Sequence, residues 1–151
     1  MLATTFIIQA IAYKLLDKSV LLNAKTPNLG DLEQRSAHQA RLLHKLEQDK
    51  AYLDDGLTLQ AFSESLDLPA AYVTELINQK FNCSFKRLIN RYRLQEAKRL
   101  MESPEGAHMK LIDIAYDSGF NNKVSFYRVF KEFEGQSPSE YLETRKKAEK
   151  R

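Results

Sequence analysis

Few residues in this sequence have the types and spacings that enzyme chemistry needs. His38 and His44 are six residues apart, about 240° around a helix, so they cannot share a face as metal ligands or as an acid and base pair. The single cysteine, Cys83, has no histidine near it in the sequence and stands at an expected helix start. There is no glycine-rich phosphate loop and no HExxH motif. We therefore expect a protein that is not an enzyme and that uses no cofactor and no metal.

Basic side chains are the groups that could carry a function, and they are concentrated in one stretch. The chain has 23 Lys and Arg against 20 Asp and Glu, a net charge of +3, and the excess lies in residues 57–151. Residues 80–99 hold seven basic residues and a single acidic one, Glu96. Such a strong local field favours the phosphates of a nucleic acid as the partner.

An internal repeat spans these basic residues and predicts how they are positioned. Sliding the sequence by 52 positions places Phe62 on Ile114 and Asp67 on Gly119, and the offset becomes 53 after one inserted residue. In each copy two apolar helical segments flank a turn of a few residues, which is the helix-turn-helix pattern. Glycine permits a positive φ in the second turn, and aspartate tolerates it in the first.

Composition and patterning predict an all-α fold. Glycine and proline together number nine in 151 residues, too few for the many turns of a sheet protein. Apolar residues at helical spacing predict a helix from about Asp31 to Lys50 and a long basic helix over residues 85–101 that joins the two helix-turn-helix units. The predicted organisation is an N-terminal helical segment and linker (1–56), a domain of two helix-turn-helix units (57–144) and a basic C-terminal tail (145–151).

The most specific motifs of the chain lie in two separate stretches. They are IDIAYDSGF and VSFYRVFKEFEGQSPSEYL within residues 112–142, and CSFKRLINRYRLQEAKRLM at residues 83–101. Over residues 57–144 the chain resembles the C-terminal DNA-binding domain of AraC/XylS-type transcription regulators. This resemblance implies a sequence-specific regulator whose partners are double-stranded DNA, RNA polymerase subunits and a second copy of the chain. Three positions depart from the family pattern: Asn82, Val124 and Leu142.

The expected DNA-reading residues lie on the outward face of the second helix of each unit. The major groove of B-DNA accepts one helix and returns to the same side after about 34 Å, so two such helices can read successive turns. The predicted readers of the first unit are short and nearly uncharged, and those of the second are mostly basic: Ala70, Ala71, Thr74, Glu75 and Asn78, then Lys123, Val124, Tyr127, Arg128 and Lys131. We expect the second helix of the first unit to be selective for DNA sequence and to bind DNA weakly.

The long helix carries more arginines than can face the duplex. Arg87 and Arg91 are predicted to contact phosphates. For Arg93 a buried structural role against the neighbouring unit is an equal alternative, and Tyr127 either stacks on DNA or covers the core. The alternative function is a helical protein-interaction module that has lost DNA binding. The acidic Glu75 favours this alternative, and so do Val124 and Leu142, each of which removes a phosphate contact that the family resemblance implies.

The N-terminal segment leaves two interpretations open. Residues 1–16 are largely apolar but fall short of the roughly 20 residues that span a bilayer. They either pack as a helix on the rest of the protein or a partner, or form the inner end of a membrane segment, since residues 36–59 are similar to the segment that follows a membrane sensor in one branch of the family. Residues 1–56 are too few to enclose a ligand pocket, so we expect the signal that controls the regulator to come from elsewhere. We expect the protein to be cytoplasmic. A membrane sensor or a membrane surface is a further expected partner, through residues 1–16.

Overall fold

The computed structural model describes residues 29–149, and every regular element in that range is a helix. This confirms the predicted all-α fold. The described residues from Gln39 onward form one compact part of the structure, which contains both copies of the repeat. The apolar residues 1–16 lie outside the described range.

The helix α2 (Leu29–Glu47) precedes the first copy of the repeat. Its C-terminal half buries Leu42 and Leu46 in the core of the first helix-turn-helix unit. The sequence predicted a helix from about Asp31 to Lys50, whereas α2 begins at Leu29 and ends at Glu47. Lys50 lies outside the helix and has a left-handed backbone with φ of 48°. A short 3-10 turn, η2 (Ala51–Leu53), then carries the chain toward the repeat.

The first helix-turn-helix unit consists of α3 (Leu59–Glu64) and α4 (Ala70–Phe81). The Thr58 side chain accepts a hydrogen bond from the Ala61 N–H at 3.1 Å and so caps the start of α3. Asp67 takes the positive φ, 54°, that the sequence predicted for the turn. Asn82 ends α4 in the left-handed conformation with φ of 51°, which asparagine adopts at lower cost than most residues.

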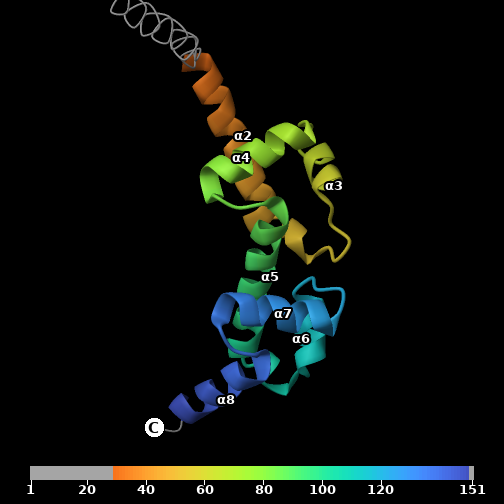
Figure 1. The fold of residues 1–151 in the computed structure, drawn as a ribbon, viewed down its shortest axis with the longest axis vertical. Coiled ribbons are helices and arrows are strands. Elements are labelled where there is room, and N and C mark those ends of the chain that lie inside the picture. Colours follow the sequence, from red (N-terminus) through yellow and green to blue (C-terminus); the bar gives the residue numbers. More distant parts are fainter. Residues whose placement is uncertain (1–28, 150–151) are drawn as a thin grey trace, which may run out of the picture. The chain divides into compact units, whose positions relative to one another are not determined.

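The long helix α5 (Phe85–Glu102) belongs to both units. Its first half supplies Leu88 and Ile89 to the core of the first unit, and its second half supplies Leu94 and Ala97 to the core of the second. Figure 1 shows α5 running from the α3 and α4 pair to the α6 and α7 pair. One continuous helix thus fixes both units to a common axis, as the sequence predicted.

The second unit consists of α6 (Leu111–Asp117) and α7 (Lys123–Glu134), followed by α8 (Pro138–Glu149). Gly119 provides the positive φ of the turn, 86°, and the Asn122 side chain caps α7 by accepting from the Ser125 N–H at 2.8 Å. The core of this unit is aromatic, with Phe120, Phe126 and Phe130 almost fully buried. Buried aromatic rings of this size supply most of the apolar area that holds a small unit together.

Candidate DNA-binding face

The outward face of α7 combines three cations with one apolar side chain. Lys123, Arg128 and Lys131 are exposed, and Val124 exposes 77% of its surface. Val124, Arg128 and Lys131 fall within about 60° of one another around the helix, whereas Phe126 and Phe130 are about 100–160° away from them and point into the core. The buried aromatic face therefore fixes which side of α7 is presented to a partner.

Tyr127 lies at the edge of this face and packs against the core. Its ring meets that of Phe126 edge to face at a centroid separation of 5.8 Å. The Nζ of Lys123 sits 5.2 Å from the centre of the Tyr127 ring, which orients the lysine beside the start of α7. The ring thus packs against the core, and its stacking on DNA stays a prediction.

The corresponding face of α4 carries no cation. Ala71, Glu75 and Asn78 are exposed, and Ala70 and Thr74 are partly buried. The Thr74 hydroxyl donates to the Ala70 carbonyl at 2.9 Å, which leaves its methyl group as the part free to meet a base. Glu75 accepts a hydrogen bond from the Gln79 side chain at 3.0 Å. This face offers a carboxylate and an amide to a base edge and has little attraction for phosphate.

Polar contacts around η2 fix the two units to each other. The Arg93 guanidinium donates to the carbonyl of Tyr52 at 2.8 Å and to that of Asp54 at 2.7 Å. Burial lowers the pKa of Arg93, and the nearby Asp54 and Asp55 oppose that shift. Gly119, from the second unit, lies against the same turn, since a Cβ there would clash with the Tyr52 carbonyl oxygen. Arg93 has the structural role that the sequence left as one of two alternatives.

We call the contacts of Arg93 and Gly119 with η2 the junction between the two helix-turn-helix units, and a buried carboxylate, Glu96, lies beside it. Glu96 is 8% exposed and accepts from Arg99 at 2.8 Å and from Lys50 at 3.5 Å. Hydrogen bonds from Arg99 lower the pKa of Glu96, so the group stays ionised at neutral pH. The single acidic residue of the basic stretch is thus a partner of two cations.

A helix-turn-helix domain family matches residues 62–144, which include both units and the linking helix. The chain belongs to the AraC-type helix-turn-helix family. This family consists of DNA-binding domains of transcription regulators and is not a class of enzymes. The resemblance predicted from residues 57–144 is therefore confirmed, whereas its link to the branch with a membrane sensor stays a prediction.

Relatives of this AraC-type domain include two operon regulatory proteins. The Msm operon regulatory protein of Streptococcus mutans is 26% identical over 85 residues, which are 56% of this chain and 30% of the relative. The melibiose operon regulatory protein of Escherichia coli is 26% identical over 88 residues, 58% of this chain and 28% of the relative. The chain thus spans less than a third of the length of these relatives.

A solved structure shares the fold of the AraC-type domain. The C-terminal domain of AraT, a response regulator from Geobacillus stearothermophilus, superposes with a TM-score of 0.58 at 24% identity, covering 80% of this chain and 88% of that one. At this level of identity the likeness concerns the fold. Within residues 29–149 no helix is both long enough and apolar enough to cross a membrane.

The predicted phosphate contacts of the AraC-type domain are engaged within the protein. Arg87 pairs with Glu132 at 2.5 Å and lies 4.7 Å from the centre of the Phe133 ring. Arg91 lies 5.6 Å from the centre of the Phe81 ring, at the end of α4. Each arginine therefore links α5 to the C-terminal end of the second helix of a unit, Arg87 to α7 and Arg91 to α4. A phosphate would have to compete with Glu132 for Arg87.

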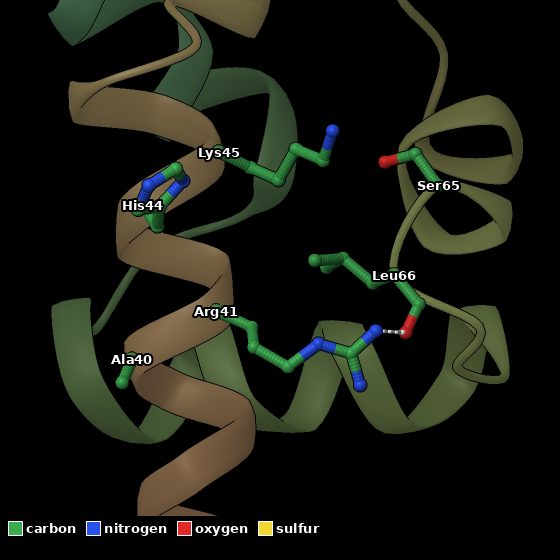
Figure 2. Close-up of a pocket in the computed structure, with 6 residues that line it drawn as sticks. All are labelled: Ala40, Arg41, His44, Lys45, Ser65 and Leu66. Carbon is green, nitrogen blue, oxygen red and sulfur yellow. Dashed lines mark hydrogen bonds between the residues drawn. The ribbon is translucent and has the colours of Figure 1, made fainter.

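A groove of about 430 Å³ separates α2 from the end of α3 in the first unit. Figure 2 shows Arg41 and Lys45 extending across it toward Ser65 and Leu66. The Arg41 guanidinium donates to the Leu66 carbonyl at 2.7 Å and so holds the turn that precedes α4. The predicted reading residues do not line this groove.

The junction residues Lys50 and Tyr52 were missed by sequence analysis. Lys50 acts through an ion pair with Glu96, 46 residues away, and Tyr52 acts through its backbone carbonyl. Neither contact leaves a mark in local periodicity or in motif spacing. The only sequence signal was the isolated Glu96 within a basic stretch, which points to a paired carboxylate.

Proposed function

We propose that this AraC-type domain binds double-stranded DNA by placing α4 and α7 in two successive segments of the major groove, and that the chain regulates transcription from such a site. The observation that carries this is the outward face of α7, where Arg128 and Lys131 are exposed opposite a fully buried aromatic face. Within residues 29–149 neither cation forms an ion pair with the protein, so both can reach phosphates.

The two recognition helices have different roles in this proposal. The second unit supplies the attraction to the backbone through Lys123, Arg128 and Lys131. The first unit offers Glu75 and Asn78 to base edges, where an amide can pair with adenine and a carboxylate can accept from cytosine N4. Binding by α7 brings α4 to the next segment of groove, so weak contacts of α4 can still select sequence.

The junction makes this division of roles effective. Arg93 and Gly119 hold both units against the same turn, and α5 contributes to both cores. A fixed separation between α4 and α7 favours sites whose two segments lie about one helical turn, roughly 34 Å, apart.

Selection of binding sites from random duplexes, followed by titration of the chosen duplex at several salt concentrations, tests the proposal. We expect a site with two conserved segments and an affinity that falls steeply with salt. A chain that selects no sequence and shows no salt-dependent binding to DNA would favour the protein-interaction module that has lost DNA binding.

Residues 1–16 are assigned a role outside DNA binding, either in self-association or at a membrane surface. Their apolar composition and the self-contained cores of the two units support this. Deletion of residues 1–30 should preserve helicity and DNA affinity while lowering oligomer mass or recovery with membranes. Loss of cooperative unfolding in the deletion variant would show that the segment belongs to the core.

A further inference from the structure

Val124 has no explanation in the fold. Of the large hydrophobic residues within positions 29–149 it exposes the largest fraction of its surface, 77%. Valine is also less favourable in a helix than alanine, because its branched Cβ restricts the side chain. Neither core packing nor helix stability accounts for a valine in the first turn of α7.

The position of Val124 points to a role in contact with DNA. It lies on the same stripe as Arg128, one turn further along α7, and as Lys131, two turns further along. Lys123 precedes it and is held beside Tyr127. In helix-turn-helix proteins the N-terminal residues of the helix that enters the major groove contact base edges. Val124 is the first member of this stripe, and the cations further along it attract phosphates, so the valine is the member directed at a base edge.

The major groove presents only one apolar group to such a side chain. Base edges there carry hydrogen-bond donors and acceptors, except for the C5 methyl group of thymine. Valine against a donor or acceptor leaves that group without a partner, which costs free energy, whereas valine against the methyl group removes two apolar surfaces from water.

We propose that Val124 recognises the C5 methyl group of one thymine in the segment that α7 reads. The inference rests on the proposed function and adds the base and the chemical group that are read. Burial of a single methyl group corresponds to about a fourfold gain in affinity. The matching residue of the first unit is the shorter Ala71, so we expect a weaker contact with a thymine methyl group in the first segment.

Replacement of single thymines by deoxyuridine tests this directly, because deoxyuridine keeps the base pair and lacks only the methyl group. The full chain is titrated with its selected duplex and with duplexes that carry deoxyuridine at one position each. We expect one position in the second segment to weaken binding about fourfold. The Val124→Ala variant keeps only the Cβ, so its difference in affinity between the thymine and deoxyuridine duplexes should fall well below fourfold.

A matched control is Tyr116→Ala, which removes an exposed apolar side chain from α6 of the same unit. This variant should retain the difference between thymine and deoxyuridine. A wild-type chain that binds its site tightly but ignores every deoxyuridine would overturn the inference and leave the proposed function intact. A fourfold difference that persists undiminished in Val124→Ala would assign the methyl group to another residue. If the chain selects no sequence, the proposed function fails and the inference falls with it.

Discussion

The two helix-turn-helix units have the same backbone geometry and differ in the chemistry of their exposed faces. The turn residue has a positive φ in both, 54° at Asp67 and 86° at Gly119, and the recognition helices both end in a left-handed residue, Asn82 and Gly135. The outward faces have opposite charge, since Glu75 in the first unit corresponds to Arg128 in the second. Backbone geometry is thus repeated, and the exposed positions carry the difference in charge.

The turns of the two units also differ in their surroundings. Asp67 is exposed and lies 3.7 Å from Arg41, while Gly119 is buried against η2. The second turn is therefore part of the junction between the units, and the first is a surface feature. The same local geometry can be tolerant of substitution in one unit and intolerant in the other.

Substitution of the turn residues should show the largest difference. Gly119→Ala forces a side chain into the left-handed region and toward the Tyr52 carbonyl and the Leu53 Cα, 2.9 Å away, so we expect a loss of about 2 kcal/mol or more in the free energy of unfolding. Asp67→Gly should change it by less than about 1 kcal/mol. Urea denaturation measures both, and equal costs would contradict a special role for the second turn.

Removal of the positive charges on the outward face of α7 should show the next largest effect, on the salt dependence of DNA binding. The Lys123→Ala, Arg128→Ala double variant should lower the magnitude of the log–log salt slope by about one to two, because each phosphate contact contributes about 0.9. The charge-conserving pair Lys123→Arg, Arg128→Lys should keep the wild-type slope. Titration at several salt concentrations measures this, and an unchanged slope in the alanine variant would show that α7 binds by another face.

Glu75 tests the selective role of the first unit. Glu75→Gln keeps the shape of the side chain and removes its charge, so preference at one base pair should shift by about 1–3 kcal/mol if the carboxylate accepts from cytosine N4. Competition between duplexes that differ at that pair measures the shift. A uniform rise in affinity on all sequences would make Glu75 a repulsive charge near the backbone and remove its role in selection.

The sequence predicted the parts of this molecule that follow from local patterning. Turn residues, helix periodicity and the repeat identified both units, because Asp67, Gly119 and Asn82 act through their own backbone conformation. It did not predict that η2 joins the units, since the contacts of Arg93 and Gly119 with Tyr52 connect distant positions through a carbonyl group that every residue has. The DNA-reading residues themselves are still predictions, because an exposed side chain is available to DNA but is not thereby shown to contact it.

Ser63 provides the test with the smallest expected effect, at a single core position that differs between the two units. It is 1% exposed, and its hydroxyl has no hydrogen-bond partner among the described residues, whereas the matching residue of the second unit is the fully buried Ala115. A buried hydroxyl without a partner costs free energy, so Ser63→Ala should raise the free energy of unfolding by about 1 kcal/mol. Ser118 is the matched control, because it is equally buried but donates to the Ile114 carbonyl at 2.6 Å. Ser118→Ala should therefore give no such gain in urea denaturation. A destabilised Ser63→Ala variant would mean that the hydroxyl stabilises the first unit and that the two cores differ by more than this one atom.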